Sequence, residues 1–277
     1  MPQRDPEQYT QGDDGLIIEK VGSWAVEKLK LVTDYVYASG GARKRFLGTG
    51  AAYIDPFCGS GRSLIRGTGT FIDGSPVAAF KRALQSPGRF SSINISDGDE
   101  ELLAAATKRL SALNAPVRPV PGPASEALPK IIQSLNRNGL HLAFLDPYNL
   151  AALSLDLFKQ LAKLNNIDVI AHVSVSDLQR NGARYADKDY DQFDKFAPDW
   201  RAKVSTGMNK EAFRAAILKY WSDQVTALRL PQAKHWELIR GDQGQRLYWL
   251  ILLVRHKLAH GLWAKVSSAA KSPTFDF

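Results

Sequence analysis

One loop of the sequence combines acidic, small and flexible residues in a pattern suited to binding a small ligand. The loop is Asp55-Pro56-Phe57-Cys58-Gly59-Ser60-Gly61-Arg62, and it follows the apolar run AAYID at 51–55. Two glycines separated by one residue allow the backbone to approach a ligand closely. The alternative is a turn that only needs flexible residues. We expect a nucleotide-like ligand to bind at Asp55, Pro56, Phe57, Gly59, Ser60 and Gly61.

Neighbouring residues discriminate between the candidate ligands. A phosphate-binding NTPase loop needs Gly-Lys-Ser/Thr, and the sequence has no such triplet. The dinucleotide fingerprint needs a third small residue where Leu64 stands, and its helix should begin at once. S-adenosylmethionine remains, because its positively charged sulfonium and amino groups are compatible with a carboxylate such as Asp55. We therefore expect S-adenosylmethionine as the cofactor.

A second acidic segment, Ser96-Asp97-Gly98-Asp99, ends the apolar run SSINIS at 91–96. A carboxylate at the tip of a strand next to the first one can accept both hydrogen bonds of a ribose diol. Asp97 is our candidate for this role, and Asp99 fits the N-cap of the next helix. The alternative is that both acids only cap.

A third segment, Phe144-Leu145-Asp146-Pro147-Tyr148-Asn149, ends the run HLAFLD at 141–146. The Asp146 carboxylate and a carbonyl held by Pro147 can accept both protons of an exocyclic amine, and Tyr148 offers a ring for stacking. We therefore expect Asp146, Pro147 and Tyr148 to support methyl transfer to an amino nitrogen without a metal. The alternative is a helix-entry turn in which Asp146 accepts backbone hydrogen bonds.

The elements that must position these loops alternate along the chain. Apolar segments predict strands over 51–55, 91–96, 116–120, 141–146 and 168–175, with amphipathic helices over 22–39, 99–112, 124–135 and 154–164. A helix capped by Ser75 is expected after the glycine loop. Later residues predict a helix over 209–229, a hairpin from 234–240 and 246–254, and a last helix over 259–269. This order indicates a parallel α/β sheet covered on both faces.

The motifs AYIDPFCGSGR, ISDGD and FLDPYNL resemble the cofactor loop, ribose acid and catalytic loop of class I S-adenosylmethionine-dependent methyltransferases, especially those acting on amino groups. That resemblance implies a three-layer, Rossmann-like fold with a mainly parallel seven-stranded sheet and an antiparallel C-terminal hairpin. We expect a flexible N-terminus over 1–21 and one methyltransferase-like domain over 22–277, with a helical insertion at about 178–230.

More narrowly, the chain resembles the three-Cys-motif partner family, TcmP, across residues 22–265. The resemblance lies in WAVEKLKLVTDYV, DGSPVAAF and YWLILLVRHKLAHGLW. It implies a partner protein with three cysteines, similar to radical S-adenosylmethionine enzymes, and a second hypothesis in which this chain is its accessory subunit. It also suggests that Trp24 and Lys28 cover the cofactor entrance, although a simple packing role explains them equally well.

The composition sets the class of protein and locates its charge. The chain has 277 residues, 44% hydrophobic and 23% charged, which is typical of a globular protein and excludes disorder and coiled coil. Residues 1–200 hold 23 basic and 23 acidic side chains, whereas 201–277 hold 13 and 5. A basic segment suits a polyanion, so we expect residues 201–277 to contact nucleic acid. The alternative is a solvated surface or an acidic protein partner.

The remaining reactive residues favour ordinary roles. Cys58 is the single cysteine, which excludes an internal disulfide or a cysteine-built cluster within this chain and favours a cytoplasmic location. A packed thiol is the preferred interpretation of Cys58. His256 and His260 are four residues apart but lack a third ligand, so we expect no metal. No signal peptide is recognisable, and the longest apolar run, at 247–254, is too short to span a membrane.

Overall fold

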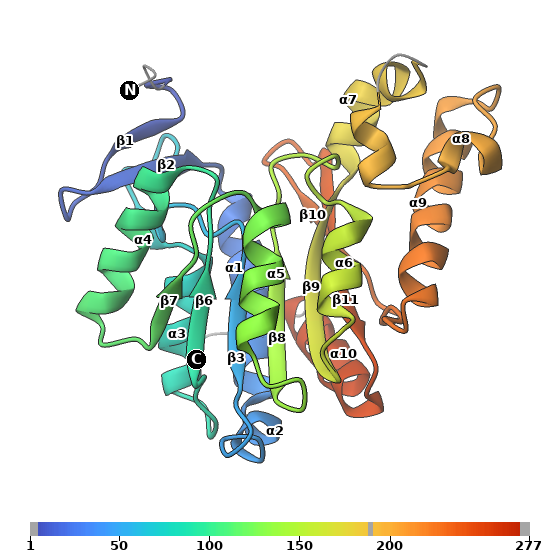
Figure 1. Cartoon of the computed structure of the whole chain (residues 1–277). Coiled ribbons are helices and arrows are strands. Elements are labelled where there is room, and N and C mark those ends of the chain that lie inside the picture. The colour runs from blue at the N-terminus through green and yellow to red at the C-terminus, as the bar shows by residue number, and fades with distance from the viewer. Residues whose placement is uncertain (1–4, 188–190, 272–277) are drawn as a thin grey trace.

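The chain is built on a seven-stranded sheet with the order β10-β11-β9-β8-β3-β6-β7 (Figure 1). The structure is a computed structural model that describes residues 5–187 and 191–271. The strands are β3 (Ala52–Asp55), β6 (Ser92–Ile95), β7 (Val117–Pro119), β8 (Leu140–Leu145), β9 (Asn166–Ser174), β10 (Glu237–Arg240) and β11 (Arg246–Val254). All neighbours from β9 to β7 pair in parallel, and β11 is antiparallel to both β9 and β10. The predicted fold class, with its closing hairpin, is confirmed.

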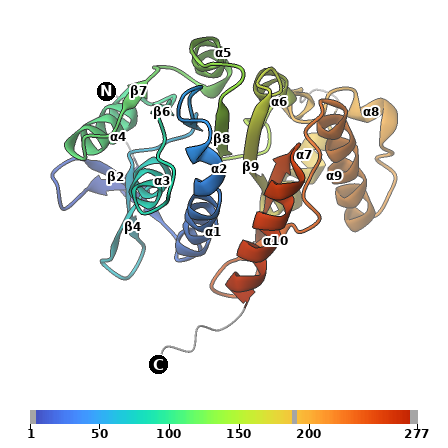
Figure 2. The ribbon, with the colours of Figure 1, turned by 90° about the horizontal axis from the view of Figure 1, so that it is seen from below.

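Helices cover both faces of this sheet, as the end-on view shows (Figure 2). One face carries α1 (Trp24–Ala38), α3 (Ser75–Leu84), α4 (Glu100–Ala112) and α10 (Lys257–Lys271), and the other carries α5 (Ala124–Ser134), α6 (Leu155–Leu161) and α9 (Lys210–Ala227). The short α2 (Gly40–Lys44) leads from α1 towards β3. Within the described ranges, no helix is both long and apolar enough to cross a membrane.

The described elements between β9 and β10 are all helical, in the region where we expected a helical insertion. They are α7 (Val175–Ala186), a 3₁₀ turn (Gln192–Lys195), α8 (Trp200–Lys203) and α9. They lie beyond the β9 edge in Figure 1. Aromatic side chains join them to the core: the Trp221 ring lies 5.6 Å from that of Phe158 and stacks on Phe196 at 5.4 Å.

The N-terminal segment differs from the expectation of a flexible tail. Within 1–21, β1 (Tyr9–Gln11) and β2 (Ile17–Val21) form strands of a second sheet with the order β1-β2-β4-β5. Its other members are β4 (Arg62–Ile65) and β5 (Phe71–Asp73), where we expected a loop. β2 pairs in parallel with β4 across about forty residues of sequence, and such a long-range pairing leaves no local signal. This small sheet lies above the carboxyl edge of β3 and β6 in Figure 1.

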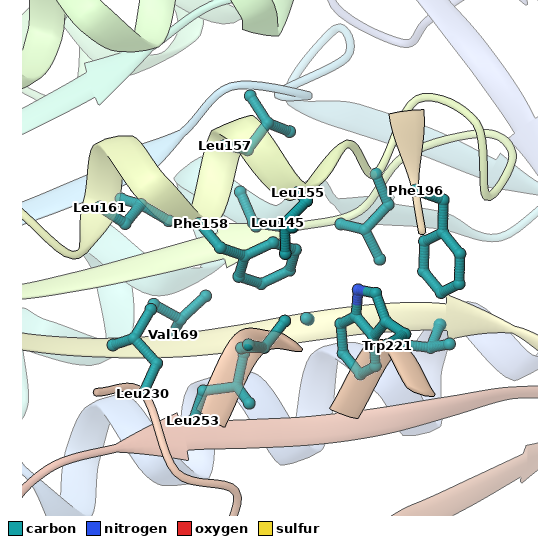
Figure 3. Close-up of a cluster of buried hydrophobic side chains, with 14 of the residues drawn as sticks. Leu145, Leu155, Leu157, Phe158, Leu161, Val169, Phe196, Trp221, Leu230 and Leu253 are labelled. Carbon is teal, nitrogen blue, oxygen red and sulfur yellow. The ribbon is translucent and has the colours of Figure 1, made fainter. Parts of the chain in front are cut away.

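A cluster of apolar side chains between the large sheet and the helices α6 and α9 provides much of the core (Figure 3). Leu161 and Phe158 project from α6 towards Val169 of β9 and Trp221 of α9. Leu161, Phe158 and Trp221 are each fully buried. Because interiors are close-packed, removing a side chain here leaves a cavity that the surroundings fill only in part.

Leu161→Ala should lower the free energy of unfolding by about 2–5 kcal/mol, since it loses buried methyl groups and leaves a cavity. Leu258 provides a matched control because its side chain is 52% exposed on α10. Leu258→Ala should change the stability by no more than about 0.5 kcal/mol. Urea unfolding of both variants measures the difference, and equal losses would contradict the packing described for α6.

Candidate functional site

The three acidic loops meet at one edge of the large sheet. β3 lies between β6 and β8 and pairs in parallel with both, so the segments after these strands emerge side by side. Asp55 ends β3, Asp97 follows β6 by two residues, and Asp146 follows β8 directly. The arrangement places three carboxylates at neighbouring strand ends, where ligands of open α/β sheets bind.

Asp55 is fully buried and is held by three donors. The Ser75 hydroxyl donates to Oδ2 at 2.6 Å, the Tyr53 hydroxyl donates to the same oxygen at 3.3 Å, and the Phe57 N–H donates to Oδ1 at 3.3 Å. Burial raises the pKa of Asp55 to about 7, and the nearby Asp146 carboxylate acts in the same direction. Asp55 therefore exchanges its proton near neutral pH.

The role of Ser75 differs from the predicted helix cap. The N-cap of α3 is Gly74, and Ser75 and Pro76 stand in the first turn. The Gly74 N–H donates to the Gly61 carbonyl at 2.8 Å, and a Cβ on Gly74 would lie 2.7 Å from the Gly61 carbonyl carbon. This close approach requires glycine at the cap, which leaves the Ser75 hydroxyl to bind Asp55.

Positive backbone φ angles shape the glycine loop. Gly59 has a φ of 54° and Gly61 a φ of 77°, a region that strains other residues. The Gly59 N–H donates to Asp97 Oδ2 at 2.9 Å, and the Ser60 hydroxyl donates to the Arg62 carbonyl at 2.6 Å. The loop is thus tied to the β6 end and exposes little side chain, since Pro56, Cys58 and Ser60 are buried and Phe57 is half-buried.

Asp97 and Asp99 divide the roles that the sequence left open. Asp99 caps α4, accepting hydrogen bonds from the backbone N–H groups of Glu101 and Leu102. Asp97 accepts from the Gly59 N–H through Oδ2 and from the Asp99 N–H through Oδ1 at 2.9 Å. Asp97 is half-buried and lies between the glycine loop and α4. Each carboxylate oxygen accepts up to two hydrogen bonds, so Asp97 retains capacity for a hydroxyl ligand.

Glu19 is a fourth carboxylate at this edge, which the sequence analysis missed. It reaches the loop from β2, and its Oε2 accepts the Ser60 N–H at 3.2 Å. A Cβ on Gly59 would lie 2.3 Å from that oxygen, so Gly59 makes room for Glu19. Burial raises the pKa of Glu19, and the charges of Asp97 and Asp146 add to the effect. No motif marks Glu19, because its position depends on the long-range β2–β4 pairing.

Asp146 forms the centre of a charged cluster with Lys28 of α1 and His172 of β9. The Lys28 ammonium donates to Oδ2, and Nδ1 of His172 lies 2.6 Å from Oδ1. Burial alone would raise the pKa of Asp146, but Lys28 and His172 together hold it well below its usual range. Of the two uses suggested for Lys28, neither included this ion pair, and His172 carried no signal in the sequence.

The turn after β8 does not need Asp146 for its own hydrogen bonds. Asn149 Oδ1 accepts from the Ala152 N–H at 2.8 Å, and the Leu150 N–H donates to Asp177 Oδ2 at 2.8 Å. The helix-entry interpretation of Asp146 is therefore not supported, since its contacts are to two side chains. Pro147 is buried, whereas Tyr148 is 88% exposed. Asp177 of α7 thus anchors the loop whose tip presents Tyr148 to solvent.

The other reactive residues lie outside this cluster of charges or are inert. The Cys58 thiol is buried, and burial raises its pKa well above the ordinary value, as expected of a packed thiol. Within residues 5–187 and 191–271, no three or more His, Cys, Asp and Glu side chains gather in a way that can hold a metal ion.

Comparison with solved structures gives similarity in fold at low sequence identity. The O-methyltransferase TomG from Streptomyces achromogenes, solved in complex with SAM, is 17% identical with a TM-score of 0.44, covering 83% of this chain and 80% of TomG. An O-methyltransferase from Bacillus cereus in complex with SAH is 14% identical with a TM-score of 0.45, covering 84% and 82%. Trm1 from Pyrococcus horikoshii with S-adenosyl-L-methionine is 9% identical with a TM-score of 0.47, covering 91% and 62%.

Comparison at the level of sequence gives no match. No protein-family model matches the chain, and no curated protein matches it. The narrower resemblance to the three-Cys-motif partner family is accordingly not confirmed.

Asp55→Asn should change how stability depends on pH. The pKa of Asp55 is about 7 in the folded chain and about 3.9 in an unfolded one, so the folded state binds its proton more tightly. This contribution is complete below about pH 4 and is lost as pH rises through about 7. Urea unfolding between those values should show the wild type losing stability relative to Asp55→Asn as pH rises. The exposed Asp156 provides a control, and a constant difference would contradict the shifted pKa.

Proposed function

We propose that this chain is a methyltransferase that binds S-adenosylmethionine at the carboxyl ends of β3 and β6 and methylates an amino nitrogen at the end of β8. The observation that carries the proposal is the gathering of Glu19, Asp55, Asp97 and Asp146 around a glycine loop. Such a site favours a ligand that is positively charged and small enough to approach the backbone. An anionic pyrophosphate would be repelled by the same carboxylates.

The residues present fit this cofactor by their chemistry. Asp97 has acceptor capacity for ribose hydroxyls, and the carboxylates of Glu19 and Asp55 complement the amino and sulfonium charges. Gly59, Ser60 and Gly61, together with Pro56 and Phe57, would line the backbone side of the ligand. When bound, the cofactor supplies an electrophilic methyl group.

The residues at the β8 end would hold the acceptor. Asp146 stays ionised because its pKa is low, so it accepts hydrogen bonds and donates none. An acceptor amine would replace the Lys28 ammonium on Oδ2, while His172 keeps Oδ1. Together with the carbonyl held by Pro147, this contact fixes the direction of the nitrogen lone pair. Most of the rate would come from this positioning.

Nucleic acid is the proposed class of acceptor. The Tyr148 side chain is 88% exposed at the tip of the loop, which suits stacking with an unpaired base. Lys203, Lys210 and Lys219 are exposed in the basic segment 201–277, although Lys219 also pairs with Asp223. Phosphate contacts of this kind would position the strand without selecting its sequence.

An accessory role beside a three-Cys-motif protein is the second candidate. The observation that favours it is that both carboxylate oxygens of Asp146 are already engaged, by Lys28 and His172. A chain whose acceptor site is closed by its own side chains suits a subunit that binds cofactor while a partner carries out the chemistry. The two candidates differ in whether the chain methylates an acceptor on its own.

Cofactor binding tests the first part of the proposal. Asp97→Ala should weaken S-adenosylmethionine by about 1–3 kcal/mol, because a buried ligand hydroxyl loses its acceptor. Calorimetry with S-adenosylmethionine and S-adenosylhomocysteine measures the affinity, and Asp156→Ala on the exposed face of α6 should leave it unchanged. Binding of NAD in place of both compounds would refute the methyltransferase proposal.

Methyl transfer tests the second part. Asp146→Ala should abolish transfer of a radiolabelled methyl group to DNA or RNA while cofactor affinity stays within a few fold, since Asp146 is assigned to the acceptor. Equal activity of variant and wild type would remove Asp146 from the mechanism. A wild-type chain that binds cofactor but becomes active only with a three-Cys-motif protein would favour the accessory role.

A further inference from the structure

Two polar atoms without a hydrogen-bond partner lie beside the acceptor site. They are Nε2 of His172 on β9 and the hydroxyl of Tyr248 on β11, and both are buried. The two rings are in contact, with centroids 3.8 Å apart and planes tilted by 52°. A buried polar atom without a partner costs free energy, and such atoms in a native chain call for a functional explanation.

The hydrogen bond to Asp146 determines which nitrogen of His172 carries the proton. Asp146 is ionised and can only accept, so Nδ1 at 2.6 Å from its Oδ1 must be the N–H donor. A neutral imidazole has one N–H, and Nε2 therefore keeps its lone pair. The pair thus presents an unprotonated nitrogen next to the carboxylate that would hold an acceptor amine.

We propose that His172 is the general base of the reaction, with Nε2 taking the proton that the acceptor nitrogen loses on methylation. This inference rests on the proposed function. The acceptor nitrogen forms a bond to the methyl carbon, the carbon–sulfur bond breaks with its electron pair left on sulfur, and one N–H proton passes to Nε2. The resulting imidazolium is stabilised by Asp146, which remains a carboxylate throughout.

The groups that face His172 keep it neutral before the reaction. Burial lowers its pKa, the hydrogen bond and charge of Asp146 oppose that effect, Lys28 of α1 lowers the pKa, and Asp177 of α7 raises it. The net direction is down, so the ring is unprotonated at neutral pH. Tyr248 of β11 faces the ring as well, and burial keeps its hydroxyl protonated at neutral pH by raising the pKa of that group.

Access to Nε2 depends on Lys28. The side chains of His172 and Asp146 are 14% and 19% exposed, so the pair lies at the border of the site rather than deep in the core. The Lys28 ammonium binds Asp146 and stands 5.7 Å from the centre of the Tyr248 ring, on which His172 packs. When an acceptor amine replaces Lys28 on Asp146, the long lysine chain leaves this ring and opens the path to Nε2.

The protonation state of His172 is tested by ¹⁵N NMR of the histidine-labelled chain, without any acceptor. The chain has five histidines, and the spectrum of His172→Asn assigns the missing signal. At neutral pH, Nδ1 should resonate as a protonated nitrogen and Nε2 as an unprotonated one, with or without S-adenosylhomocysteine. A spectrum with the proton on Nε2, or on both nitrogens, would overturn the proposal.

The role in the reaction is tested with His172→Asn, whose side-chain amide can still donate to Asp146 from the position of Nδ1 but has no base at Nε2. Single-turnover methyl transfer to the nucleic acid that the wild type methylates should fall by about 100-fold or more, with little change in cofactor affinity. The wild-type rate should fall as pH drops below about 6.5, where the base becomes protonated, and the residual rate of the variant should not.

The outcomes separate this inference from the function on which it rests. A variant that keeps the wild-type rate and pH profile would show that His172 only positions Asp146, and would overturn the inference while the proposed function stands. Lack of cofactor binding by the wild type would instead contradict the proposed function. In that case the NMR measurement alone decides whether Nε2 is the unprotonated nitrogen that a base requires.

Discussion

The close approach of carboxylates at one sheet edge is the physical constraint on which the rest of the site depends. Three neighbouring strands end in or just before Asp55, Asp97 and Asp146, and β2 brings Glu19 to the same place. Charges of one sign repel strongly where water is excluded. The chain offsets this repulsion in three ways: a pKa of about 7 for Asp55, backbone N–H donors for Asp97 and Glu19, and a cationic partner for Asp146. Each solution fixes a different part of the site.

The small N-terminal sheet acts as part of the site's framework. Arg109 of α4 donates to the Ser60 carbonyl at 2.5 Å and to the Ile17 carbonyl at 3.1 Å, and its guanidinium pairs with Asp14 at 2.7 Å. The hydrogen bond from Arg109 lowers the pKa of Asp14 to about 2. One side chain thus connects the glycine loop to the segment that carries Glu19. Loss of that connection would release both the loop and the carboxylate above it.

The strands, loops and carboxylates that follow from local pattern were predictable, and the contacts made by distant elements were not. Asp55, Asp97 and Asp146 each end an apolar run, and the alternation of runs and helices is enough to bring them to one edge. Glu19, Lys28 and His172 lie on a strand, a helix and a strand whose sequences fit ordinary packing. Their roles depend on pairings and side-chain directions that no local spacing encodes, such as the β2–β4 register and the packing of α1 over β9 and β11.

The glycines of the loop illustrate why a motif alone underdetermines its ligand. Gly59 is required because Glu19 occupies the space of a Cβ, whereas a Cβ on Gly61 would lie 3.2 Å from the Ala106 backbone of α4. Neither reason involves a phosphate, although the Gly-x-Gly spacing also serves phosphate-binding loops. The Ser60 N–H that could bind an anion is already given to Glu19. An anionic ligand would have to displace that carboxylate, while a cationic ligand gains from it, so the structural context of the glycines favours the cation.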